Sequence, residues 1–453
     1  MAEIAPFRGI LYALPSGGDV SALIAPPYDV ISEPERAALE QRSPYNCVRL
    51  ILPRDEQGGD GEGRYAVAAA TLRAWLDAGV LRRDPQPALY RYHQVFTPPG
   101  AEQGKRVVRR GFIARMRLHR FEERIILPHE RTLAGPKADR LKLKRAVRMH
   151  LSQIFGLYRD PTGAADAAFA RIEQEPPERY GVTADGTEHR LWRLTDRQAQ
   201  EQVMAALRDK TIYIADGHHR YETMLALREE LRREPSYIGY ASSVEYGTIF
   251  LCEAHDPGLL VFPTHRILHG LPHFDFADLL RRAASFFCVD EVAPPSPVQA
   301  TQELAARGRQ APTLLVVSDG RAAYLSLRPE ADLLAVEGLA GPAVLRRLDV
   351  TLLHAVVLEG LLGIDRAAQE AQTHLRYVKD TAQALAAAHE PGVQAVWLMN
   401  PTPVAQVMEV CDAGLLMPQK STYFFPKIAS GLVLNPLDPA EPVETVAGRR
   451  PAA

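Results

Sequence analysis

The stretch that decides the fold is Thr211-Ile212-Tyr213-Ile214-Ala215-Asp216-Gly217-His218-His219-Arg220-Tyr221-Glu222. Residues 211–215 are typical of a strand, and the positions after them carry the three- and four-residue apolar spacing of a helix: Tyr221, Met224, Leu227 and Leu231. Asp216 is expected to cap the start of this helix, and Gly217 permits a tight turn close to a ligand. We therefore expect an α/β protein of the mixed-sheet (α+β) kind.

The same turn has the composition of an anion site. A helix that begins where a strand ends presents free N–H groups and the positive end of its dipole. His218, His219 and Arg220 add cationic donors to that first turn, which suits a phosphate group. The alternative is a polar turn that caps a helix and faces water.

The composition narrows the class of protein. The chain has 453 residues, 46% hydrophobic and 24% charged, which is ordinary for a soluble protein of two or three units. A net charge of −2 gives no bulk attraction to DNA or to an anionic membrane. The four cysteines lack CxxC spacing, residues 1–10 lack the apolar core of a signal peptide, and no apolar run approaches membrane-spanning length. We expect a cytoplasmic protein, and its oligomeric state stays open.

The chain predicts three parts. An N-terminal unit over residues 1–272 carries the Asp-Gly-His-His-Arg turn, and a second α/β unit covers residues 273–435. Residues 436–453 are predicted to form a flexible tail. Within the first unit we expect a hairpin of Leu89–Phe96 and Val107–Leu118, a strand over Cys47–Leu52 and a basic helix over Leu141–His150.

Further polar clusters resemble the turn in chemistry. Cationic side chains can hold phosphoryl oxygens, and a carboxylate can hold Mg²⁺ or accept a hydroxyl proton. Only eight of the 53 basic residues are Lys, so each Lys is informative. The candidate carboxylates are Asp29, Glu35 and Glu130, and the candidate cations and hydroxyls outside the turn are Arg131, Lys137, Arg140, His265, Arg266, Lys420, Ser421, Thr422 and Lys427.

Other chemistries lack their sequence patterns. A Walker A sequence, a kinase glycine loop, HExxH and GxSxG are all absent. Adjacent helical residues such as His218 and His219 point about 100° apart, which makes them poor joint ligands of zinc.

The chain resembles a bacterial and archaeal family known mainly as a domain of unknown function. The resemblance covers roughly residues 1–435 and rests on separate motifs in order: Ala25-Pro26-Pro27-Tyr28-Asp29-Val30, Pro128-His129-Glu130, Pro136-Lys137-Ala138-Asp139-Arg140, Ala215-Asp216-Gly217-His218-His219-Arg220-Tyr221, Pro263-Thr264-His265-Arg266 and Met417-Pro418-Gln419-Lys420-Ser421-Thr422. It names a family and no reaction.

The turn alone is similar to the phosphate-binding turn of the ParB/sulfiredoxin-like superfamily, which includes free-serine kinases, ParB nucleotidases and sulfiredoxins. His218 stands where sulfiredoxins have a reactive Cys, and no basic recognition helix supports ParB-type DNA binding. The resemblance therefore implies a ParB/sulfiredoxin-like core and the free-serine kinase branch, with ATP or ADP and Mg²⁺ as cofactors.

The resemblance implies a nucleotide-dependent kinase of a small hydroxyl compound, with free serine as one acceptor. Its catalytic residues would be Asp216, His218, His219, Glu130 and Asp29, and Asp216 would contact Mg²⁺. The phosphate or nucleotide would be bound by Gly217, Arg220, Arg131, Lys137, Arg140, His265, Arg266, Lys420, Ser421, Thr422 and Lys427. Two alternatives stay open: a regulator that binds a nucleotide or phosphometabolite without turnover, and a ParB-like nucleotidase associated with DNA. We expect no membrane or nucleic-acid partner.

Overall fold

The computed structural model describes residues 1–453 except 56–62, 102–103, 133, 337–338, 340 and 444–453. The chain forms two compact units. Unit 1 comprises Met1–Pro128, Thr132–Leu260 and Pro426–Ala453, and unit 2 comprises His129–Arg131 and Val261–Phe425. The change from one unit to the other thus comes at Leu260, twelve residues before the predicted boundary at 272, and the chain returns to unit 1 at Pro426.

Unit 1 is built on a ten-stranded mixed sheet. Its strands, in spatial order, are β3 (Gly18–Asp19), β10 (Arg179–Val182), β11 (Glu188–Leu194), β5 (Leu89–Phe96), β6 (Val107–Arg117), β13 (Tyr246–Glu253), β9 (Ile154–Tyr158), β12 (Ile212–Asp216) and β7 (Ile126–Leu127), with β1 (Ile4–Ala5) beside β6. The pairs β13–β9, β12–β7 and β10–β3 are parallel, and the other pairs are antiparallel.

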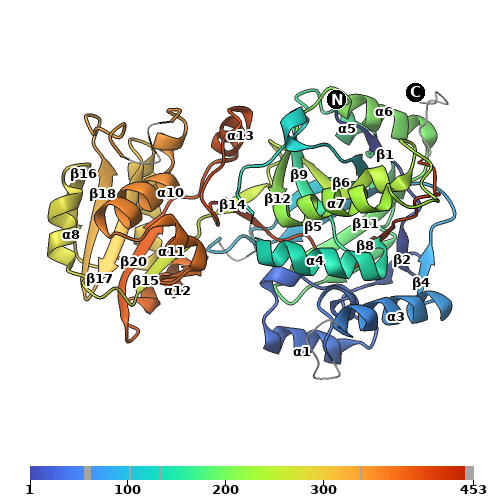
Figure 1. Ribbon diagram of the computed structural model, residues 1–453, viewed down its shortest axis with the longest axis horizontal. Coiled ribbons are helices and arrows are strands. Elements are labelled where there is room, and N and C mark those ends of the chain that lie inside the picture. The colour runs from blue at the N-terminus through green and yellow to red at the C-terminus, as the bar shows by residue number, and fades with distance from the viewer. Residues whose placement is uncertain (56–62, 102–103, 133, 337–338, 340, 444–453) are drawn as a thin grey trace. The chain divides into compact units, whose positions relative to one another are not determined.

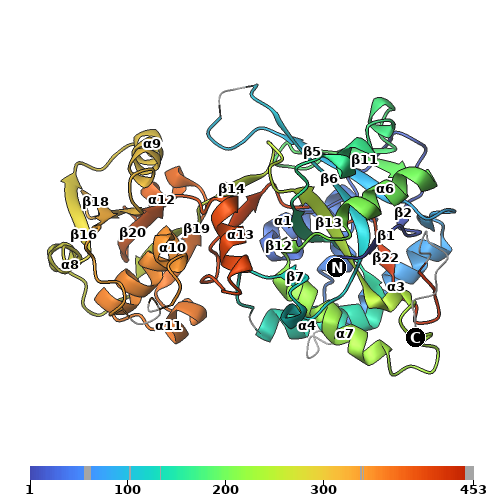
Figure 2. The same ribbon diagram turned by 90° about the horizontal axis from the view of Figure 1, so that it is seen from above.

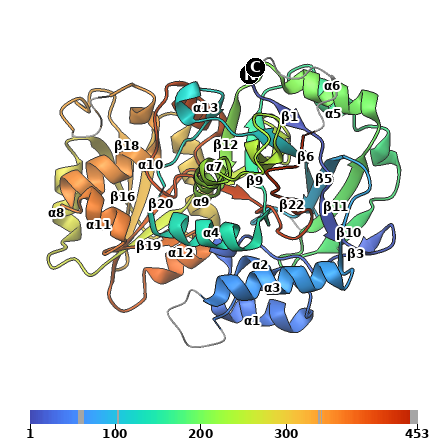
Figure 3. The same ribbon diagram turned by 45° about the vertical axis from the view of Figure 1, so that its right-hand side comes forward.

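The helices of unit 1 are α1 (Glu33–Arg42), α2 (Val48–Ile51), α3 (Gly63–Asp77), α4 (Ala134–Val147), α5 (Ala164–Ala167), α6 (Arg197–Leu207) and α7 (His218–Leu231). Figures 1 and 3 show α4 lying between α3 and α7, and α4 contacts both. The short strands β2 (Ile10–Tyr12) and β4 (Leu81–Arg83) pair with each other, as do β8 (Met149–His150) and β22 (Asn435–Pro436).

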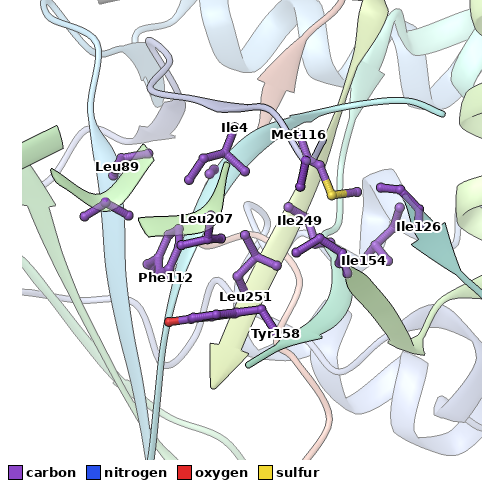
Figure 4. Close-up of a cluster of buried hydrophobic side chains, with 14 of the residues drawn as sticks. Ile4, Leu89, Phe112, Met116, Ile126, Ile154, Tyr158, Leu207, Ile249 and Leu251 are labelled. Atoms are coloured by element: carbon purple, nitrogen blue, oxygen red, sulfur yellow. The ribbon is translucent and has the colours of Figure 1, made fainter. Parts of the chain in front are cut away.

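The main core of unit 1 joins the sheet to its helices. Figure 4 shows part of it, with Phe112, Ile154, Ile249 and Leu251 meeting in the interior. Tyr221 and Met224 of α7 belong to the same buried cluster. Burying side chains of this size stabilises the fold by roughly 1.5–3 kcal/mol each, so the start of α7 is held firmly on the sheet.

Unit 2 is a second α/β unit. Its sheet runs β16 (Phe287–Val292), β18 (Arg321–Leu327), β17 (Thr313–Ser318), β20 (Val393–Met399), β15 (His265–His269) and β19 (Leu375–Val378), all paired antiparallel. Figure 2 shows α9 (Pro297–Gly308) and α12 (Thr381–Ala387) on one face, with α8 (Phe276–Ala283), α10 (Asp349–Leu352) and α11 (Arg366–Ala371) on the other. A π-helix, η6 (Leu353–Leu361), continues α10, and the remaining elements are α13 (Val404–Asp412), β14 (Leu260–Phe262) and β21 (Tyr423–Phe425).

The mixed α/β class and the predicted hairpin are confirmed, since β5 and β6 pair antiparallel. The predicted strand over Cys47–Leu52 is wrong. Residues 48–51 form α2, because the Asn46 side chain accepts a hydrogen bond from the Val48 N–H (2.9 Å) and turns the chain. Val48, Leu50 and Ile51 are all buried, and periodicity cannot distinguish such a run from a buried strand.

The predicted basic helix over Leu141–His150 starts earlier and ends sooner, as α4. It ends at Val147 because Met149 and His150 pair as a strand with Pro436 and Asn435. The glycine-rich sequence of residues 55–63 predicts an exposed loop, and this stretch lies largely outside the described residues.

The segment expected to begin a flexible tail packs onto unit 1 as far as it is described. Leu437 and Val443 are both only 6% exposed. The Glu441 carboxylate binds the buried Arg115 guanidinium at 3.0 Å and also pairs with Arg83. The apolar anchors and buried ion pair account for the order of residues 436–443.

Candidate functional site

The strand–turn–helix prediction for residues 211–222 is confirmed, and the turn joins β12 to α7. Ile212, Ile214 and Ala215 are buried in the sheet, and the helix begins at His218. Gly217 has φ +93°, and a Cβ placed there would lie 2.9 Å from the Arg220 guanidinium. Glycine is therefore required both by the backbone and by the close packing of Arg220 over the turn.

Asp216 does not cap the helix as predicted. Gly217 occupies the N-cap position, and no side chain there accepts a hydrogen bond. The Asp216 carboxylate is instead held by two cations, with Arg220 donating at 2.6 Å and Lys427 donating to the other oxygen. Burial alone would raise the pKa of Asp216, but the charges of Lys427, Arg220 and His218 outweigh it and hold the pKa below its ordinary value.

Arg220 is also fixed from its other side. The residue is 5% exposed, and its guanidinium donates to the backbone carbonyl of Gln153 in addition to Asp216. His218 is buried and His219 is half-buried in the first turn of α7. The turn is therefore a rigid, positively charged start of a helix.

A cavity of about 30 Å³ lies beside Arg220. Three cationic side chains line it: Arg140 and Lys144 from α4 and Arg220 from α7, each less than 10% exposed. Tyr28 and Ser430 also line it, and the buried Ser430 hydroxyl has no hydrogen-bond partner among the described residues. The space takes one or two water-sized groups, so only the end of a ligand fits inside.

The carboxylates near this cavity do not balance its cations. Asp139 binds Arg140 at 2.6 Å, but it also binds Arg64 at 2.8 Å. Asp216 is likewise shared between Arg220 and Lys427. In the described part of the chain Lys144 has no carboxylate partner, and its Nζ lies 3.1 Å from Nδ1 of His150. The cavity therefore carries an excess of positive charge.

Lys144 shows the effect of this excess. Burial, together with repulsion from Arg220 and Arg140, lowers the pKa of Lys144 from 10.5 to about 7. Burial and the charge of Lys144 also lower the pKa of His150. Sequence reasoning did not single out Lys144, although the scarcity of lysine was a signal that pointed to it.

The predicted residues of unit 1 are not all at this cavity. Lys137 donates to Glu222 at 2.7 Å, and Thr132 binds the same carboxylate at 2.8 Å. Glu35 forms a capping box with Ser32, whose backbone N–H donates to the Glu35 carboxylate at 2.7 Å. Asp29 is exposed on the short helix η1 (Tyr28–Val30), next in sequence to the cavity residue Tyr28.

The other predicted residues belong to unit 2, where Arg266 is the centre of a buried network. The residue is 0% exposed. Its guanidinium donates to the carbonyls of Thr264, Gln419 (3.3 Å) and Lys420 (3.2 Å) and to His354 Nε2 (3.1 Å). Burial lowers the pKa of Arg266 to about 10.

Most of the other predicted site residues of unit 2 have contacts within that unit. His265 faces the Thr381 hydroxyl at 3.2 Å, and burial and the Arg266 charge lower its pKa to about 4. The Thr422 hydroxyl meets His129 Nε2 at 2.9 Å, and Ser421 donates to the Pro418 carbonyl. The backbone of Glu130 pairs with that of Met417 in an isolated parallel β-bridge. Arg131 and Lys420 are exposed.

Within the described residues there is no group of three or more His, Cys, Asp or Glu side chains placed to hold a metal ion. Both oxygens of Asp216 already contact cations. Nor is any described helix long and apolar enough to cross a membrane.

Comparison with known proteins identifies the family. Residues 4–351 match the model of a family described as proteins of unknown function, DUF1015. The chain belongs to the DUF1015 family. A search of curated proteins finds no match.

Solved structures show only a remote likeness to this DUF1015 protein. A free serine kinase in complex with AMP is 11% identical, over 69% of this chain and 88% of that one, with a TM-score of 0.33. A conserved hypothetical protein from Pyrococcus furiosus is 13% identical over 67% and 89%, with a TM-score of 0.34. SbnI with a C-terminal truncation from Staphylococcus aureus is 9% identical over 68% and 83%, with a TM-score of 0.33. TM-scores this low do not transfer a function.

Proposed function

We propose that unit 1 binds the phosphate groups of ATP or ADP at the cavity beside the β12–α7 turn. The observation that carries this proposal is the set of three buried cations, Arg140, Lys144 and Arg220, around one small space. A phosphoryl group there would be the negatively charged partner that Lys144 lacks among the described residues. Hydrogen bonds between charged groups are stronger than those between neutral groups. The rest of the nucleotide would lie outside the cavity.

The turn contributes in two ways to this proposal. Gly217 lets the Arg220 guanidinium pack closely over the turn, and the positive dipole end of the 14-residue helix α7 favours an anion. Lys427 and Asp216 hold Arg220 in place. The resemblance assigns Mg²⁺ to Asp216, but both oxygens of this carboxylate already contact cations, so we propose no Mg²⁺ ligand there.

The proposed reaction is phosphoryl transfer to a small hydroxyl compound such as free serine. The acceptor hydroxyl gives its proton to a carboxylate, and its oxygen bonds to the terminal phosphorus. The bond from that phosphorus to its bridging oxygen breaks, leaving ADP from ATP or AMP from ADP. Asp29, next in sequence to the cavity residue Tyr28, is the candidate base in unit 1.

Calorimetric titration with ATP and ADP tests the binding. Lys144→Ala should weaken binding about tenfold or more, because it removes one charge-assisted bond worth about 1.5–3 kcal/mol. Lys105→Ala is the matched control, since Lys105 is an exposed lysine in the same unit. Equal affinities for the two variants would remove the cavity from the site.

Incubation with Mg²⁺, serine and either nucleotide tests the reaction. Phosphoserine detected by mass spectrometry, lost in Lys144→Ala, is the expected outcome. Nucleotide binding without product over long incubation would support the regulator instead. Salt-sensitive DNA binding would support the ParB-like alternative, for which a net charge of −2 gives no electrostatic basis.

A further inference from the structure

A second and larger cavity, of about 150 Å³, lies within unit 2. Thr351 of α10 and His354 of the π-helix η6 line it, together with Glu370 of α11, Tyr377 of β19 and the segment Met417–Gln419. None of the residues at the unit 1 cavity takes part. The volume resembles that of a cavity that holds benzene, so a compound of roughly six to nine non-hydrogen atoms fits.

Arg266 places a positive charge behind this cavity. Among the described residues its hydrogen bonds go only to neutral acceptors, and its buried Nε has no partner. Glu130 attracts it only as a more distant charge. Two of its partners, His354 and Gln419, line the cavity directly. A negative group in the cavity would therefore sit next to a charge that is not compensated at contact distance.

The position of His354 is fixed by its neighbour Gln369. The Gln369 amide nitrogen donates to the carbonyls of Ile364 (2.7 Å) and His354 (3.3 Å), so its oxygen must accept from His354 Nδ1 at 2.7 Å. Nε2 is then the acceptor for Arg266. This side of the cavity is preorganised, and it lies on a π-helix, a form frequent at functional sites.

Three side chains on the cavity are left for a ligand. The Thr351 hydroxyl is buried, with the residue 6% exposed, and has no hydrogen-bond partner in the described structure. Buried polar groups are normally satisfied, so this hydroxyl points to an absent partner. Arg131 and Glu370 are exposed, and neither has an ion pair with another described residue. The cavity thus offers both charges to one small molecule.

We propose that the unit 2 cavity binds a free amino acid or a zwitterion of that size. Its carboxylate would accept from Thr351 within the field of Arg266, with Arg131 as a second cation. Its ammonium group would meet Glu370. A simple anion would leave Glu370 unmatched, and a simple cation would face Arg266. This site is separate from the nucleotide site and does not depend on it.

Calorimetry with the free amino acids tests the site. We expect at least one to bind with a Kd of about 1 mM or lower, and propionate and ethylamine to bind at least about tenfold more weakly. Thr351→Val should weaken binding about tenfold and leave the melting temperature unchanged or higher, because its hydroxyl bonds to no described residue. Glu370→Gln should also weaken binding about tenfold.

Thr301→Val is the matched control, since the exposed Thr301 hydroxyl bonds within α9 to the Pro297 carbonyl. It should leave affinity unchanged. Binding of no amino acid, binding of propionate as tightly as its amino acid, or full affinity in Thr351→Val would each overturn the proposal. Thr351→Val should bind ATP and ADP with the affinity of the wild type. A loss of amino acid binding in this variant is therefore distinguishable from a failure of the nucleotide site in unit 1.

Discussion

Replacing Lys144 by Met should make the protein more stable at neutral pH. The folded state holds the pKa of Lys144 at about 7, whereas an unfolded lysine titrates near 10.5. Between these values the unfolded chain binds a proton that the folded chain does not, so the wild type gains stability as the pH rises. From about pH 7 to pH 9 the gain is about 2 kcal/mol, from 1.36 kcal/mol per pKa unit. Lys144→Met, which has no charge there, should lack this gain.

The groups that face Lys144 support this sign. Arg140 and Arg220 repel its charge, and the pKa of His150 is itself lowered, so His150 is neutral over this range. Urea unfolding should be followed in a Trp397→Phe background, because the remaining Trp75 and Trp192 both report on unit 1. The exposed Lys105→Met is the control. The same pH dependence in the wild type and Lys144→Met would refute the electrostatic account of the cavity.

Three further perturbations test the site and the chain terminus. Gly217→Ala should destabilise unit 1 by about 1–3 kcal/mol, since φ is +93° and the new Cβ would meet Arg220, and thermal melts measure this. Asp216→Asn should cost about 2–4 kcal/mol at pH 7 by leaving two cations unpaired; the wild type should approach the variant as acid titrates Asp216, whose pKa is lowered. Truncation after Asn435 should cost about 3–5 kcal/mol by removing the carboxylate of the buried Arg115. An unchanged melt in any of them would contradict the assigned contact.

Structural elements that depend only on residues close together in the chain were predictable from the sequence. The turn at Asp216-Gly217 followed from a strand pattern, a glycine and a helix pattern in direct succession. Residues 48–51 were not predictable in the same way, because three of the four are buried and so short a buried run lacks the periodicity that separates strand from helix.

The cavity could be predicted only in part. Arg140 and Arg220 stood out by their motifs, but Lys144 matters because α4 packs on α7 and because His150 is drawn into a strand with Asn435. Those contacts join positions up to 285 residues apart. The order of residues 436–443 has the same origin, since it depends on a carboxylate meeting a distant buried arginine.

The cost of Lys144 is itself an argument for a ligand. Holding this lysine charged in the folded protein costs on the order of 5 kcal/mol, from the gap between 10.5 and about 7. Domains are stable by only about 5–15 kcal/mol in total, and an apolar residue would avoid this cost. A phosphoryl group in the cavity would raise the pKa of Lys144 again, so binding at about pH 8 should take up a proton. The energy lost in burying the lysine is then recovered when an anion binds.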